Sequence, residues 1–329
     1  MTFFCDLRRF GARVLAPVAL ATAVLMACGG GTSQVAAFKP TRLLVLGDES
    51  SVLVNDGSHD GFKYGLNDRR GTAAGKCLAL GTIAQRVAAL YGFVSSECNP
   101  LAAEPKAFIR ATPGAKVADL TAQLAGVTGQ LGASDLVNVL IGVNDVIGAY
   151  EHVRAGTLTA DAAVGVVRGS GGLLAAQINS ILGTGARALV VTIPDLSLSP
   201  YAANAYKTDP HAFALLRTLS YEFNANMRTR IDGTSFDGRN YALVLADDIV
   251  AAMSKSPASF LTAPANATAA VCTTASALDC QITNDATTTT LVTGGGVATH
   301  LWASDRILGP EAQSRIGQQA QSRAVHNPF

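Results

Sequence analysis

Short apolar runs that end in glycine or in a polar residue recur along this chain. The clearest occupies residues 43–46, is broken by Gly47-Asp48, and is followed by small polar residues. Such a run is typical of a strand buried on both faces, and the residues after it predict a tight turn that begins a helix. Further runs that predict strands occupy residues 108–111, 135–145, 185–195 and 241–245.

Between these runs, apolar residues recur at the spacing of a helix. Predicted helices cover residues 82–91, 117–131, 160–183, 211–230 and 311–322. In the third of these, Leu174, Ile178 and Leu182 fall on one face, and Thr159 is placed to cap the first turn. Regular alternation of strands and helices predicts an α/β fold, a three-layer sandwich with a central parallel sheet and helices on both faces.

Two long stretches interrupt this alternation. Residues 55–75 are polar and rich in Gly and Asp, and residues 254–296 are rich in Pro, Ala and Thr. Both are predicted to be loops. Long loops beside the carboxyl edge of a sheet often shape a binding site, although a solvated excursion fits the first stretch equally well.

The N-terminus has the pattern of a secretory signal peptide. Three arginines, at positions 8, 9 and 13, precede an apolar run over residues 14–26 that is too short to remain as a spanning anchor. Residues 25–28, Leu-Met-Ala-Cys, resemble the cleavage box of bacterial lipoproteins, and this resemblance implies a lipid on Cys28. An ordinary signal peptide followed by a chance cysteine is the alternative.

The predicted organisation is a signal peptide at residues 1–27, a flexible Gly-rich tether at residues 28–40, and one domain at residues 41–329. A lipid on Cys28 would anchor the chain to a membrane, which would then be a binding partner of the protein. The protein would belong to a bacterial cell envelope. The glycine after Cys28 favours the outer membrane, by analogy with other lipoproteins.

The amino-acid composition and net charge of the chain exclude some classes of function. The chain has 329 residues, of which 49% are hydrophobic and 15% charged, so it can bury one large core. Removal of residues 1–27 takes away three arginines and one aspartate, and the formal charge changes from +1 to −1. A near-neutral domain without a basic stripe argues against a nucleic-acid partner.

Four cysteines remain after the signal peptide and Cys28: Cys77, Cys98, Cys272 and Cys280. An even number in an exported chain predicts two disulfides, and pairing of the sequence neighbours is the simplest of three connectivities. A zinc site is the alternative, but no Cys-x-x-Cys spacing or cluster of histidines supports it. We therefore expect no metal and no cofactor.

Several short blocks follow the predicted strands in a fixed order. After Gly47-Asp48 come residues 111–115 (Ala-Thr-Pro-Gly-Ala), residues 142–145 (Gly-Val-Asn-Asp) and residues 301–308 (Leu-Trp-Ala-Ser-Asp-Arg-Ile-Leu). Together, over residues 41–320, they resemble the SGNH or GDSL family of serine esterases and lipases, especially its lecithinase-like branch. The resemblance implies an SGNH or flavodoxin-like sandwich, oxyanion-hole donors from the Gly114 N–H and the Asn144 amide, and Asp305 as the triad acid.

The chain departs from this family at two decisive positions. The family has its nucleophilic serine directly after Gly-Asp, where this chain has Glu49, and its histidine base at the position of Leu308. Shifting the alignment by one residue offers Ile307, which also cannot accept a proton. The carboxylate of Glu49, close to the donors of Gly114 and Asn144, would fill the oxyanion hole as an anionic plug.

Three rearrangements would restore a reactive site. Ser50 or Ser51 could serve as a shifted nucleophile, Glu49 could itself attack, and His300 could act as the base. His300 is also explained as a packing residue on the last strand.

The sequence therefore leaves three functional hypotheses open. The first is a catalytically impaired, hydrolase-like envelope lipoprotein that binds an acyl or glycan ligand, or a protein partner, through the inherited cleft. The second is an active esterase, lipase or deacetylase with a rearranged site. The third is a purely structural role.

Overall fold

The computed structural model describes residues 38–70, 75–127, 129–236 and 240–326 of the chain. From Phe38 onward the chain forms one compact unit. The predicted signal peptide, the lipidation position Cys28 and most of the predicted tether lie outside the described residues.

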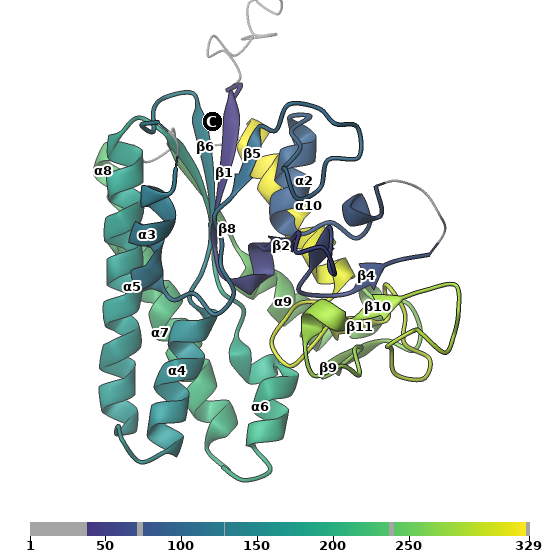
Figure 1. Cartoon of the computed structure of the whole chain (residues 1–329). Coiled ribbons are helices and arrows are strands. Elements are labelled where there is room, and N and C mark those ends of the chain that lie inside the picture. The colour runs from purple at the N-terminus through teal and green to yellow at the C-terminus, as the bar shows by residue number, and fades with distance from the viewer. Residues whose placement is uncertain (1–37, 71–74, 128, 237–239, 327–329) are drawn as a thin grey trace, which may run out of the picture. The chain divides into compact units, whose positions relative to one another are not determined.

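A parallel sheet of five strands lies at the centre of this unit (Figure 1). Its strands, in spatial order, are β5 (Ala107–Ile109), β1 (Arg42–Gly47), β6 (Asp135–Leu140), β7 (Arg187–Val191) and β8 (Tyr241–Val244). All neighbouring pairs are parallel. The carboxyl ends of β1 and β6 therefore meet at the same edge of the sheet, where the first and third sequence blocks lie.

Helices cover both faces of this sheet, because successive side chains along each strand point to opposite faces. Leu44 and Leu46 of β1 pack with one group of helices, and Leu43 and Val45 with the other. The first group is α3 (Leu120–Ala125), α4 (Val143–Arg154), α5 (Ala160–Gly183) and α7 (Ala212–Arg230), and the second is α2 (Ile83–Leu90), α9 (Ala246–Lys255) and α10 (Pro310–His326). The predicted three-layer α/β sandwich is confirmed.

Several helices and strands of the structure differ in length from the predicted ones. After Asp48 the chain makes only a single 3-10 turn, Glu49–Ser51, and then enters the short strand β2 (Leu53–Val54), so the expected helix is absent there. The helix expected over residues 117–131 is a 3-10 turn, Val117–Asp119, followed by α3, which ends before Gly126. Three helices were not predicted from the sequence: α9 and the short helices α6 (Pro200–Ala205) and α8 (Gly233–Phe236).

The two stretches expected to be loops contain short strands, and one pair of these strands joins the two stretches. In the first stretch these are β3 (Phe62–Lys63) and β4 (Asn67–Asp68), and in the second β9 (Asn266–Ala270) and β10 (Gln281–Ile282). β10 pairs with β4, and β9 pairs with β11 (His300–Trp302). The strands enclose a small third core around Leu66, Val271 and Ile307.

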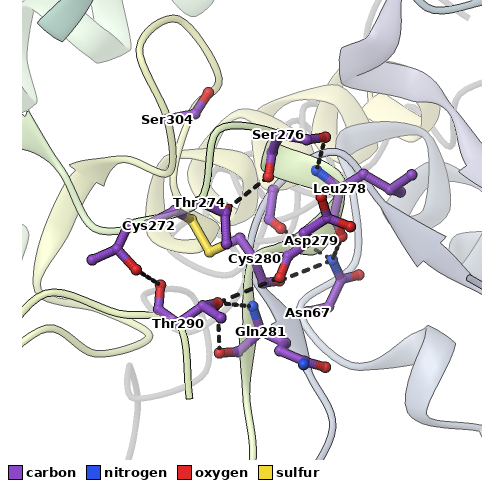
Figure 2. Close-up of a disulfide and its surroundings, with 12 residues drawn as sticks. Asn67, Cys272, Thr274, Ser276, Leu278, Asp279, Cys280, Gln281, Thr290 and Ser304 are labelled. Atoms are coloured by element: carbon purple, nitrogen blue, oxygen red, sulfur yellow. Dashed lines mark hydrogen bonds between the residues drawn. A yellow bond between two sulfur atoms is a disulfide. The ribbon is translucent and has the colours of Figure 1, made fainter. Parts of the chain in front are cut away.

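Both predicted disulfides are present, Cys77–Cys98 and Cys272–Cys280 (the second in Figure 2). Disulfides persist in oxidising compartments, so the pair is typical of a protein that folds outside the cytoplasm. No helix among the described residues combines the length and apolar character needed to cross a bilayer.

Candidate functional site

The turn after β1 is fixed by a close approach of backbone and by one glutamine. Gly47 has φ +149°, and a Cβ there would lie 2.1 Å from the carbonyl oxygen of Leu140, so only glycine fits. The side chain of Gln123 accepts a hydrogen bond from the Gly47 N–H and donates one to the Gly47 carbonyl, both at 2.8 Å. This clasp sets the direction of the chain into residue 49.

Asp48 shapes the same turn from inside the protein. Its side chain is fully buried, and Oδ1 accepts a hydrogen bond from the Ser50 N–H at 3.0 Å. Oδ2 has no hydrogen-bond partner among the described residues. Burial, together with the negative charge of Glu49, raises the pKa of the Asp48 carboxyl to about 7.

The carboxylate of Glu49 lies in the middle of the site and is 5% exposed. Its Oε2 accepts a hydrogen bond from the Gly114 N–H at 2.8 Å and from the Asn144 Nδ2 at 2.9 Å. These are the two groups that the family resemblance implies as donors to a reacting oxyanion. In this chain both of them bind Glu49.

Asn144 is held in place by the start of α4. The turn before it needs glycine at position 142, where φ is +127° and a Cβ would lie 2.3 Å from the ring of Phe223. The Asn144 side chain also donates to the carbonyl of Ala115 at 3.2 Å, which ties the second block to the third. Gly114 itself has φ +75°, again in the region that favours glycine.

Arg306 completes the surroundings of Glu49 and was not predicted from the sequence as a site residue. Its Nε lies 3.4 Å from Glu49 Oε1, and its side chain is 33% exposed. An arginine in the last block carries no signal of its own, since the family resemblance assigns roles only to the aspartate before it and to the position of Leu308. We call the Gly114 N–H, the Asn144 amide and the Arg306 guanidinium the Glu49 cage.

The triad positions of the last block lie in different surroundings. Asp305 is exposed and accepts a hydrogen bond from the Ser304 hydroxyl at 3.2 Å, and it has Arg306 Nη1 at 3.7 Å. Leu308 is buried in the core that packs under α10. Ile307, which takes the base position if the alignment is shifted by one residue, contributes to the lining of the cleft. Neither aliphatic side chain can accept a proton.

A cleft of about 300 Å³ opens over the cage. Its walls come from the first two blocks, from Tyr64, from the segment between Cys272 and Cys280, and from the last block. The lining residues, which define the Glu49 cleft, are Glu49, Tyr64, Pro113, Gly114, Ala275, Ser276, Ala277, Ser304, Asp305, Arg306 and Ile307. Ser276 and Ser304 are labelled in Figure 2.

The alternative nucleophiles and base lie outside that lining. Ser51 is 1% exposed, and Ser50 is half-buried. His300 is buried on β11, its Nδ1 pairs with the Thr299 hydroxyl at 2.8 Å, and burial lowers the pKa of its imidazole. The structure therefore brings Glu49, Gly114 and Asp305 to the lining of one cleft, and Asn144 adjoins it through its hydrogen bond to Glu49. Within the described ranges it does not bring Ser50, Ser51 or His300 to this lining.

A second cavity, of about 670 Å³, lies among α4, α5 and α7. Its lining includes Arg154, Asp161, Asp209 and His211 and contains none of the predicted site residues. Across the described part of the chain, no three His, Cys, Asp or Glu side chains come together in a way that could hold a metal ion.

No family model matches the chain, and no curated protein matches it in sequence. Among solved structures, it is similar to the acetylxylan esterase Axe2 from Geobacillus stearothermophilus, with 14% identity and a TM-score of 0.42 over 88% of this chain and 95% of that one. It is also similar to LAE5, an alpha/beta hydrolase from the metagenome of Lake Arreo, Spain, with 13% identity and a TM-score of 0.43 over 87% and 95%. For an extracellular lipase from Streptomyces rimosus the values are 18% and 0.38 over 64% and 82%. These likenesses concern the arrangement of the chain in space and assign no activity.

Proposed function

We propose that this chain is a hydrolase-like binding protein without esterase activity, in which Glu49 occupies the place of the reacting oxyanion. The observation that supports this most directly is the pair of hydrogen bonds to Glu49 Oε2, from the Gly114 N–H and the Asn144 amide. A charge-assisted pair of this kind, reinforced by Arg306, keeps both donors occupied.

The chemistry of ester hydrolysis explains why this arrangement is inactive. A serine attack needs a hydroxyl with a base in hydrogen-bond reach, and free donors where negative charge develops on the substrate oxygen. In the Glu49 cleft the first position is a carboxylate, the base positions carry Leu308 and Ile307, and the donors are engaged. Loss of nucleophile and base leaves at most a roughly 10³-fold rate over water, and an occupied hole removes that remainder.

In a protein without esterase activity, the function of the Glu49 cleft is to bind a ligand. Its lining offers serine hydroxyls, a tyrosine ring and the polar groups of Asp305 and Arg306, which suits a small polar ligand such as a glycan, an acyl-ester group or a segment of a protein partner. We further propose that the chain is a lipoprotein anchored through Cys28 and a tether over residues 28–40 to a bacterial envelope membrane, in the outer membrane. The two disulfides support export.

The catalytic part of the proposal is tested with purified full-length protein, short-chain p-nitrophenyl esters and a fluorophosphonate probe. We expect no turnover and no labelling. Labelling at Ser50 or Ser51 would instead support the active ester hydrolase with a rearranged site and His300 as base. Turnover that Glu49→Ala abolishes would assign Glu49 a role in the reaction. The anchor is tested separately, by the mass of the mature N-terminal peptide in wild type and in Cys28→Ala.

A further inference from the structure

The segment between Cys272 and Cys280 forms one wall of the Glu49 cleft. Ala275, Ser276 and Ala277 from this segment line the cleft together with residues of the first and last blocks. Any movement of this segment therefore changes the width of the entrance to Glu49.

Contacts without charge hold the base of the segment. The disulfide joins its two ends, and Asn67 Nδ2 donates to the carbonyl oxygens of Leu278 and Cys280 at 3.2 and 3.1 Å (Figure 2). The Gly65 N–H donates to the Ala277 carbonyl at 3.1 Å. None of these contacts changes with pH in the range in which proteins work.

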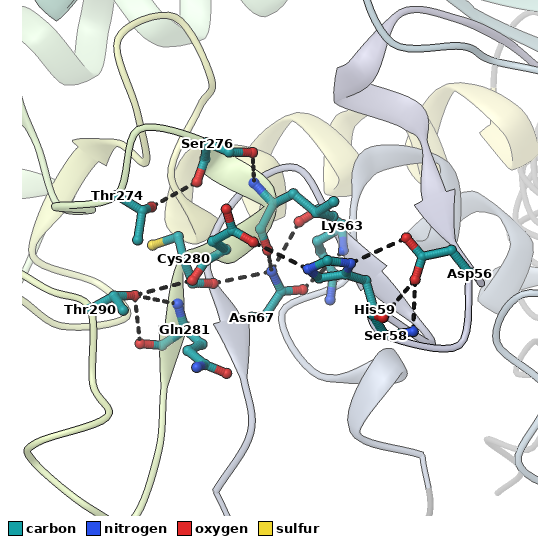
Figure 3. A network of polar contacts seen from close by, with 12 residues as sticks. Asp56, Ser58, His59, Lys63, Asn67, Thr274, Ser276, Cys280, Gln281 and Thr290 are labelled. Atoms are coloured by element: carbon teal, nitrogen blue, oxygen red, sulfur yellow. Dashed lines mark hydrogen bonds and ion pairs between the residues drawn. The ribbon is translucent and has the colours of Figure 1, made fainter.

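One further contact of the segment is ionic and involves a histidine. His59, on the loop after β2, has Nε2 3.2 Å from Asp279 Oδ1 and Nδ1 3.2 Å from Asp56 Oδ2. Figure 3 shows the ring of His59 beside Asp56. The rings of His59 and Phe62 pack edge to face, with their centres 5.4 Å apart.

These two contacts require the doubly protonated ring. An ionised carboxylate only accepts hydrogen bonds, and a neutral imidazole carries one N–H, so it can satisfy one of the two aspartates. Among the described residues, the charged groups that act on His59 are Asp56 on its own loop and Asp279 on the segment, and Arg69 stacks on Phe62. The hydrogen bond to Asp56 and, after it, the one to Asp279 raise the pKa of His59.

We propose that His59 is a pH-dependent latch on this wall: as an imidazolium it holds Asp279 and keeps the segment closed over the Glu49 cleft, and loss of its proton loosens the segment. The latch itself is a property of the free protein. Only its consequence, regulated ligand access, rests on the function proposed above.

The sign of the effect follows from linkage. The pKa of His59 is higher in the closed state than its ordinary value of 6.5, so the closed state binds this proton more tightly. The added stability of the closed segment is complete at pH values below the ordinary pKa. It is lost as pH rises from there through the higher pKa of the closed state.

Hydrogen exchange at two amides bonded to the segment measures the latch in the unliganded full-length protein. The Gly65 N–H donates to the Ala277 carbonyl at 3.1 Å and the Asn67 N–H to the Cys280 carbonyl at 3.0 Å, so their protection reports whether the segment stays bound to the chain that follows His59. After correction for the intrinsic exchange rate, we expect protection to fall about 1.5- to fivefold between pH 5.5 and 8.5, the range that exposed ion pairs allow. The fall should be complete once the pH exceeds the pKa of His59 that NMR measures in the closed state.

Three variants separate the latch from general effects of pH. His59→Gln and Asp279→Asn should show low protection that no longer changes with pH, and Asp279→Asn should also lower the NMR pKa of His59. His211→Gln, an exposed histidine at the start of α7, should keep the wild-type transition. Constant protection in wild type, or an unchanged transition in His59→Gln, would overturn the latch. Neither result bears on whether the protein hydrolyses esters, because no ester is present.

Discussion

Arg306 Nε lies 3.4 Å from Glu49 Oε1, although 257 residues separate the two in sequence. The contact joins the first block of the site to the last. Glu49 is 5% exposed, and a nearly buried carboxylate needs compensation from a cation or from several donors. Arg306 supplies the cation at the point where the resemblance leaves the last block without a histidine.

Arg306→Gln should lower the free energy of unfolding by about 1–2 kcal/mol, because it leaves Glu49 with two donors and no cation. Urea unfolding at pH 7 measures this. Arg217→Gln is a matched control, since Arg217 forms a similar contact of 3.5 Å with Asp195 but is 67% exposed, and it should cost less than about 0.5 kcal/mol. Equal costs would mean that the cage does not depend on Arg306.

Glu49→Ala should empty the cage and create a site for a small carboxylate. The unpaired donors should cost about 1–3 kcal/mol of stability, and acetate should restore part of it. At ten times its dissociation constant, bound acetate adds about 1.4 kcal/mol, which appears as a saturable rise in the melting temperature. The double variant Glu49→Ala, Asn144→Ala should respond more weakly. An identical acetate response in wild type would show that the cage is not the binding site.

Asp48→Asn should stabilise the protein at high pH and not at low pH. Burial raises the pKa of Asp48 to about 7, above its ordinary value of 3.8, so the folded state disfavours the charge and wild type gains stability as pH falls through 7 towards 4. At pH 8.5 the variant should be more stable by about 1–3 kcal/mol, and the difference should shrink by pH 5. Asparagine retains the oxygen that accepts from Ser50. A difference that does not vary with pH would exclude a buried charge as its cause.

A base introduced at position 307 should restore more reactivity than one at position 308. Both side chains are buried, Ile307 in the third core and Leu308 in the core under α10, but of the two it is Ile307 that also contributes to the lining of the cleft. In a Glu49→Ser background, Ile307→His should raise the rate of fluorophosphonate labelling by about 10²-fold, the low end for a positioned base. Leu308→His in the same background should leave the rate near that of Glu49→Ser alone and lower the melting temperature. The opposite order would mean that residue 308 turns towards the cleft.

The parts of the fold that depend on local sequence could be predicted. α5 runs over residues 160–183 as expected, because Thr159 caps its start and a long apolar stripe defines its buried face. The segment after Val117 is shorter than expected because α3 ends before Gly126. The short strands β4 and β10 beside the third core could not be predicted, because two residues carry no periodicity.

The residues of the site likewise fall into those that the sequence predicts and those that it does not. The blocks at Glu49, Gly114 and Asn144 could be placed together because each follows a strand of one parallel sheet. The contacts of Arg306 with Glu49 and of His59 with Asp279 depend on how distant loops pack. No local pattern in the sequence encodes them.

The two hydrogen bonds between Gln123 and Gly47 make the backbone conformation of the turn independent of the side chain at position 49. Both backbone groups of Gly47 are bound by a side chain from α3, and the next residue donates its own N–H to Leu140. The backbone at position 49 is thus fixed without help from the side chain that it carries. Residue 49 can therefore be substituted in evolution, which changes the chemistry of the cleft, while the backbone of the turn and the sheet keep their structure.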